Sequence, residues 1–207
     1  MKTNLKPALI AALILGLFAI AGSTLVSFTH EQTAERIAEN QRQALLRQLN
    51  KLIPAERFDN DMLTDTRIIQ APQWLGHEFS TVYHARQQGS LVALVFEIST
   101  QRGYNGSIDL LVGVNTDGSL AGVRVVNHRE TPGLGDKIEE QRSDWILSFT
   151  GRSLTDPREK DWKVKRDGGF FDQFTGATIT PRAIVAAVKN TLIYYRDHAE
   201  QLSGDPS

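Results

Sequence analysis

A run of 21 residues without a charge, from Ala8 to Phe28, constrains this chain more than any other feature. At about 1.5 Å per helical residue, the run is long enough to cross a hydrocarbon core of about 30 Å. Lys2 and Lys6 precede it, and they are expected to stay in the cytoplasm while the rest of the chain lies outside. The run therefore predicts a single N-terminal transmembrane helix.

The same run has a second interpretation, a cleavable signal peptide. A basic start, a short apolar stretch and the small-residue pattern Ala19-Ile20-Ala21 are typical of such leaders. The apolar run continues to Phe28, however, which is beyond the roughly 7–15 residues usual for a signal core. We therefore expect residues 1–29 to be a retained membrane anchor, and both interpretations export the remainder of the chain.

The chain contains no cysteine among its 207 residues. Disulfides, thiolate zinc sites, Cys-ligated iron–sulfur clusters and a C-x-x-C-H haem attachment are therefore excluded, so a redox role needs an organic cofactor or a haem bound in another way. The chain has 23 basic and 24 acidic residues. Its first 28 residues hold two lysines and no acid, so the rest of the chain has 21 basic and 24 acidic residues. This charge balance, without a basic cluster, argues against a nucleic-acid partner.

The apolar pattern beyond the anchor predicts an α+β domain. A helix at 31–53, ended by Pro54, is expected to form a stalk over residues 30–54. In residues 55–207, strands joined in pairs by turns come first and helices follow, without regular alternation of strand and helix. This order predicts antiparallel strands with flanking helices. The expected strands are 81–85, 91–98, 108–114 and 120–126, and the expected later helices are 136–149 and 181–202.

The common catalytic and metal-binding motifs are absent from the sequence. It contains no G-x-S-x-G, no H-E-x-x-H, no Walker loop and no G-x-G-x-x-G. The five histidines have no ligand spacing, so His84 is expected at the surface or edge of a strand and His128 in a simple polar role. We therefore predict no catalytic residue and no metal ligand.

The segment Glu130-Thr131-Pro132-Gly133-Leu134-Gly135 follows a predicted strand and precedes a predicted helix. Two glycines and a proline within six residues favour a tight loop whose backbone can approach a ligand closely. The residues alone also fit a plain connecting turn.

A second segment, Asp172-Gln173-Phe174-Thr175-Gly176-Ala177-Thr178-Ile179-Thr180-Pro181, leads into the last predicted helix. Thr180 is a plausible N-cap, and Pro181 suits the first helical position. A helix N-terminus with small residues beside it also accommodates a phosphate, because its N–H groups and dipole favour an anion. The segment therefore either caps a helix or binds an anionic group.

These two segments resemble motifs of a known family. Residues 172–178 match the flavinylation motif D-x-x-[ST]-G-A-T, with Thr175 in place of the commoner serine, and residues 130–135 match the E-T-P-G-L-G loop of the same FMN-binding domain. The segment Gly103-Tyr104-Asn105-Gly106 is similar to the Y-S-G segment of that family. Together with the anchor and the order of elements, the whole chain resembles the G-type subunit of Rnf (Rsx) electron transport complexes.

The resemblance implies a covalent FMN. Thr178 would carry the cofactor as a phosphate ester, after a magnesium-dependent flavin transferase had taken it from FAD. The loop at 131–135 would lie against the isoalloxazine ring with Leu134 as an apolar contact, and Asp172 would help to position the threonine or the metal of the transferase. The residues expected to contact the cofactor are Glu130, Thr131, Pro132, Gly133, Leu134, Gly135, Asp172, Thr175, Gly176, Ala177, Ile179 and Thr180.

The family also implies a complex and a cellular location. Other membrane subunits and iron–sulfur subunits of the complex would pass electrons between NADH and ferredoxin while ions cross the bacterial inner membrane, with this domain in the periplasm. The C-type subunit of the sodium-translocating NADH:quinone reductase shares the domain and the linkage, but it is typically longer. A membrane-anchored adaptor that has lost its flavin is the alternative without redox chemistry.

Overall fold

A single long helix occupies the N-terminal part of the chain. The computed structural model describes residues 5–204, and helix α1 runs over Leu5–Leu52, so the predicted anchor and stalk segments belong to one continuous helix that ends before Pro54. Its length and apolar composition make it a candidate membrane span. Lys2, predicted to be cytoplasmic, lies outside the described residues. By internal contacts the chain divides into two compact units, one ending at Leu46 and the next beginning at Arg47.

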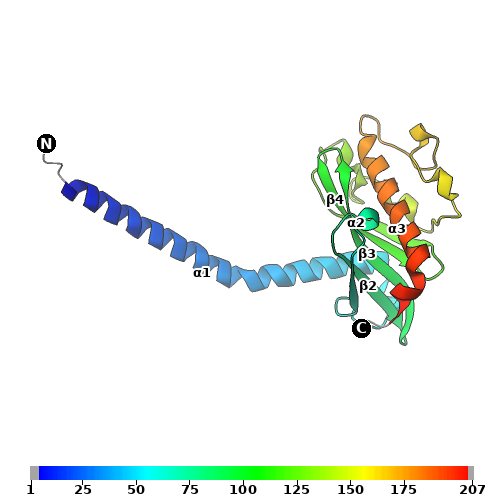
Figure 1. The fold of residues 1–207 in the computed structure, drawn as a ribbon, viewed down its shortest axis with the longest axis horizontal. Coiled ribbons are helices and arrows are strands. Elements are labelled where there is room, and N and C mark those ends of the chain that lie inside the picture. The colour runs from blue at the N-terminus through cyan, green and yellow to red at the C-terminus, as the bar shows by residue number, and fades with distance from the viewer. Residues whose placement is uncertain (1–4, 205–207) are drawn as a thin grey trace. The chain divides into compact units, whose positions relative to one another are not determined.

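The second unit is built on a five-stranded antiparallel sheet in which each strand pairs with the next along the chain (Figure 1). The four predicted strands are confirmed, and β1 and the short helix α2 (Pro72–Leu75) are additions to them. Gln88 and Gly89 have φ angles of 52° and 77°, the left-handed conformation that a two-residue hairpin turn requires. The strands are β1 Thr66–Ile69, β2 Ser80–Gln87, β3 Ser90–Gly103, β4 Gly106–Asn115 and β5 Leu120–His128.

Helix α3, Ile179–Ser203, packs against β3 and β4 (Figure 1). Its apolar positions recur at helical spacing, and the facing strand positions alternate, so each element buries one face. The α+β class is therefore confirmed. The buried apolar side chains of this core include Phe96, Ile98, Leu110, Val112, Ile184, Val188 and Leu192.

The helix predicted at 136–149 is wrong. Two short 3-10 helices stand in its place, Gly135–Ile138 and Asp144–Phe149. Between Ile138 and Trp145 the sequence offers no apolar residue that could keep a helical face buried. The second 3-10 helix is capped by Ser143, whose hydroxyl accepts a hydrogen bond from the Trp145 N–H at 3.2 Å.

The turn-rich segment 150–171 is anchored by aromatic side chains. The ring of Phe149, at its beginning, stacks on the ring of Phe171, at its end, with centroids 4.5 Å apart. Trp145 makes an edge contact with Phe174, with centroids 5.2 Å apart. Because Phe171 precedes the second predicted loop and Phe174 lies within it, these contacts attach the start of that loop to the core.

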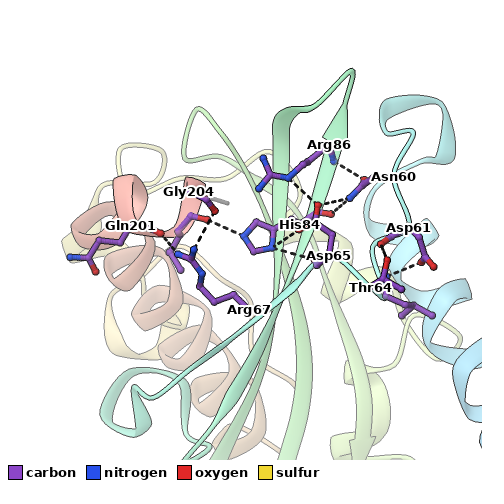
Figure 2. Close-up of polar contacts among 11 residues, drawn as sticks. Asn60, Asp61, Thr64, Asp65, Arg67, His84, Arg86, Gln201 and Gly204 are labelled. Carbon is purple, nitrogen blue, oxygen red and sulfur yellow. Dashed lines mark hydrogen bonds and ion pairs between the residues drawn. The ribbon is translucent and has the colours of Figure 1, made fainter. Parts of the chain in front are cut away.

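The expectation that His84 lies at the surface or edge is wrong, because its side chain is fully buried. Figure 2 shows it between Asp65 and the C-terminal end of α3, with Nδ1 3.2 Å from the Asp65 carbonyl oxygen and Nε2 3.0 Å from that of Leu202. Arg67 in β1 donates hydrogen bonds to the carbonyl oxygens of Gln201 and Gly204. These contacts occupy carbonyl groups that a helix end leaves without helical partners, so they attach α3 to the sheet.

Candidate functional site

The two loops singled out in the sequence meet around one cavity of about 250 Å³. Three parts of the chain line it, namely the tip of the β3–β4 hairpin, the loop after β5 and the start of α3. The lining residues are Tyr104, Glu130, Thr131, Leu134, Gly135, Gly176, Ala177, Thr178, Ile179 and Thr180. Four predicted contact residues, all within the described range, lie outside this lining: Pro132, Gly133, Asp172 and Thr175.

Glu130 is the buried acid of the cavity, with only 5% of the residue exposed. Its Oε1 accepts a hydrogen bond from the Asn105 N–H at 3.1 Å, and its Oε2 accepts one from the Thr180 hydroxyl at 2.5 Å. The carboxylate thus connects the loop after β5 both to the hairpin tip and to α3. Burial of a carboxylate is costly unless it is hydrogen-bonded, and here both oxygens have donors.

The prediction that Thr180 is the N-cap of the last helix is wrong. The helix begins at Ile179, so Thr180 and Pro181 already lie in its first turn. Pro181 is tolerated there because first-turn N–H groups have no helical acceptor. The Thr180 hydroxyl is fully buried and is used by Glu130, a partner distant in the sequence, rather than by the helix end.

Gly135 approaches Glu130 too closely for a side chain. A Cβ at this position would come within 2.6 Å of Glu130 Oε2 and 2.9 Å of Glu130 Cβ. We expect Gly135→Ala to displace the carboxylate and to lower the free energy of unfolding by about 1–3 kcal/mol, measured by urea denaturation. In Gly133→Asn the new Cβ meets open space and asparagine tolerates the positive φ of 79°, so this control should change stability little. Equal stability of Gly135→Ala and wild type would contradict the contact.

The loop after β5 is a compact turn braced by a histidine. The N–H groups of Leu134 and Gly135 both donate to the Thr131 carbonyl oxygen at 3.1 Å. His128 Nδ1 accepts a hydrogen bond from the Glu130 N–H at 3.1 Å, and its Nε2 lies 2.7 Å from Glu139 Oε1, which suits the Nε2-protonated tautomer. The turn leaves the Leu134 side chain 45% exposed, so an apolar surface faces outward beside the cavity.

Thr178 immediately precedes α3 and borders the cavity. Its side chain makes no capping hydrogen bond to the helix, and its Oγ1 accepts a hydrogen bond from the Arg166 guanidinium at 3.4 Å. Gly176 has a φ of 82°, which glycine adopts without steric cost, so the chain turns two residues before the threonine. The hydroxyl therefore stands beside the N–H groups of the first helical turn, where an anion is favourable.

Two ion pairs lie on the segment 165–182, which contains Thr178. Lys165 Nζ lies 2.5 Å from Asp172 Oδ1, and Arg182 binds Asp167 through two hydrogen bonds of 2.6 and 2.8 Å. The hydrogen bond from Arg182 holds the pKa of Asp167 below its ordinary value. In the part of the chain that the structure describes, no cluster of three or more metal-ligating side chains is present.

The cavity suits a planar, partly apolar group that ends in an anion. Leu134, Ile179 and Tyr104 give the lining apolar and aromatic surface, and Thr178, at the start of α3, adds a hydroxyl that the Arg166 guanidinium contacts. Gly176 adds no side chain to the lining, and a Cβ there would lie 3.7 Å from Leu134 Cδ2. FMN combines a planar aromatic ring with a terminal phosphate, so these residues fit it.

Two residues at this site had no assigned role in the sequence. Tyr104, 67% exposed, lines the cavity from the β3–β4 tip. Arg166 comes from the turn-rich segment and reaches Thr178. Only the resemblance of Gly103–Gly106 to a family segment gave a signal for the tyrosine, and no local pattern marked the arginine.

The fold and the cavity define an FMN-binding domain protein with an N-terminal candidate membrane span. The FMN-binding domain family matches residues 103–193, which include every residue lining the cavity, and the RnfG N-terminal region matches residues 1–52. The chain belongs to the RnfG family, the G-type subunits of ion-translocating oxidoreductase complexes.

Three relatives, each named as the G-type subunit of an ion-translocating oxidoreductase complex, support this assignment. The one from Pseudomonas aeruginosa is 48% identical over 192 residues, 92% of this chain and 90% of the relative. The one from Pseudoalteromonas atlantica is 47% identical over 191 residues, 92% and 89% of the two chains. The one from Shewanella loihica is 46% identical over 197 residues, 95% and 93%. The resemblance predicted from the two motifs is confirmed at the level of the family.

Proposed function

We propose that this protein relays electrons within an Rnf-type ion-translocating complex through one FMN, held as a phosphate ester of Thr178. The observation that carries the proposal is the position of the Thr178 hydroxyl. It makes no capping bond, borders the cavity and stands at the start of α3 within the motif D-Q-F-T-G-A-T. A cysteine-free domain can in this way hold a redox cofactor covalently.

The attachment is a group transfer without a change of oxidation state. Thr178 Oγ1 would attack the FMN phosphorus of FAD, so that an O–P bond forms, the phosphoanhydride bond breaks and AMP leaves, and the hydroxyl proton would pass to the flavin transferase. Asp172 would assist by positioning the threonine or by binding the magnesium of the transferase. Its side chain is 68% exposed and is therefore accessible to a second protein.

After attachment, this chain would orient and shield the cofactor. Leu134 and Ile179 provide apolar contacts for the ring, and the hydrogen-bonded Glu130 holds the ring-side loop to α3. The N–H groups of the first turn of α3 stabilise the negative charge of the phosphodiester. Bound FMN supplies the electron chemistry, and the protein supplies position and electrostatics.

The proposed complex spans the bacterial inner membrane, with this domain in the periplasm. Its other membrane and iron–sulfur subunits would exchange electrons between NADH and ferredoxin. The basic residues before the apolar run support this orientation, because cytoplasmic flanks carry the excess of lysine.

The absence of cysteine allows a direct test of orientation. Glu200→Cys, at an exposed position of α3, should react with a membrane-impermeant maleimide in cells with a permeabilised outer membrane. Thr3→Cys should react only after lysis. Protection of position 200 in such cells, with labelling after lysis, would reverse the proposed orientation.

The proposal of a covalent flavin is tested by co-expressing the chain with its flavin transferase. The denatured band should fluoresce under ultraviolet light, because a phosphodiester survives the detergent of the gel. A dark wild-type band would contradict the covalent linkage, and a native sample without flavin absorbance would in addition favour a membrane-anchored adaptor without a flavin.

A further inference from the structure

Three cations lie on the segment 165–182, which contains the attachment threonine, and they have different partners. Lys165 pairs with Asp172 at 2.5 Å, and Arg182 pairs with Asp167 through two hydrogen bonds. Arg166 makes no ion pair within 4.0 Å with any residue that the structure describes, although its charge also helps to lower the pKa of Asp167. Its guanidinium instead faces Thr178 Oγ1 at 3.4 Å. Two of the three cations are therefore neutralised, and the third points at the proposed nucleophile.

The backbone of Arg166 is held against the flavinylation motif. Its N–H donates to the side-chain Oε1 of Gln173 at 3.1 Å, and the preceding Lys165 N–H donates to the Phe171 carbonyl oxygen at 2.7 Å. Phe171 belongs to the buried aromatic cluster, so the backbone beside Arg166 is attached to the core. Gln173, one of the two variable positions of D-x-x-[ST]-G-A-T, thus has a structural task in this chain.

We propose that Arg166 is the phosphate-binding residue of this site, a cation that holds the phosphate of FMN beside Thr178; this rests on the proposed function. A guanidinium presents several N–H donors in one plane and can therefore contact non-bridging phosphate oxygens through two parallel hydrogen bonds. Lys165 and Arg182 could do the same only by giving up their carboxylate partners. The cation adds to the helix N-terminus, which contributes dipole and N–H groups but no full charge.

The test compares two flavins that differ only in the phosphate. The full-length chain, produced without the transferase and kept in detergent, is titrated with FMN and with riboflavin, and binding is followed by flavin fluorescence. Arg166→Gln should weaken FMN binding about two- to fivefold, the range of an exposed ion pair, and leave riboflavin binding unchanged. Arg166→Lys should recover part of the loss, and added salt should reduce the wild-type preference for FMN.

Lys160→Gln is the matched control, since it removes an exposed cation from the same turn-rich region. It should leave the affinity for both flavins unchanged. A second measurement, the rate of covalent loading from FAD by the transferase, covers the case of weak reversible binding, and Arg166→Gln should load more slowly than Lys160→Gln.

Two results would overturn this role. The first is wild-type FMN binding and wild-type loading in Arg166→Gln. The second is an equal loss of affinity for FMN and riboflavin, which would indicate a structural effect. Failure of the proposed function looks different, because the wild-type chain would then remain dark after treatment with the transferase.

Discussion

Thr178→Val is expected to abolish covalent flavin completely. Valine has nearly the shape of threonine but has no hydroxyl oxygen, so the phosphate ester cannot form while the cavity and the start of α3 remain intact. The denatured band of the variant, co-expressed with the transferase, should be dark under ultraviolet light. Intact-protein mass spectrometry should show the unmodified chain.

Thr180→Ser is the matched control for this variant. It keeps the hydroxyl that donates to Glu130 Oε2 and changes the side chain only by one methyl group, so its band should fluoresce like that of the wild type. A fluorescent Thr178→Val band would place the linkage on another oxygen of the chain.

Phe149→Ala is expected to cause the largest loss of stability, about 3–5 kcal/mol. The Phe149 side chain is fully buried, stacks on Phe171 and makes an edge contact with Trp145 at a centroid distance of 5.3 Å. Its removal leaves a cavity beneath the segment that carries Arg166. The same variant should therefore also acquire flavin more slowly.

The stability of Phe149→Ala can be measured by urea denaturation in detergent, followed by tryptophan fluorescence. All three tryptophans lie in the second unit, so the signal reports on this domain rather than on α1. Phe79→Ala serves as the control, because Phe79 is 60% exposed and its removal should change stability by less than about 0.5 kcal/mol. Similar losses in both variants would contradict a special role for the aromatic cluster.

The hairpins could be predicted from the sequence because their signals are local. Alternating apolar residues and the turn at Asn115–Gly118 lie within a few residues of each other, and the Gly118 N–H indeed donates to the Asn115 carbonyl oxygen at 2.9 Å. The two loops of the site were recognisable for the same reason, since each motif is a short continuous segment.

Other features depend on partners that are remote in the sequence. The burial of His84 depends on a carbonyl group at Leu202, and the position of Thr180 within α3 depends on Glu130. Local propensity cannot report either partner, so a strand histidine resembled a surface residue and a threonine before proline resembled a cap. Arg166 is the same case, because only the folded segment brings it to Thr178.

The cavity draws on residues from Tyr104 to Thr180, so it exists only after the central hairpin, the loop after β5 and the last helix have come together. An unfolded chain already contains the proposed attachment motif, residues 172–178, but it has no cavity for a flavin ring. If Thr178 carries FMN as proposed, productive attachment therefore follows folding. A flavin attached before folding would be exposed to solvent and to reaction with oxygen.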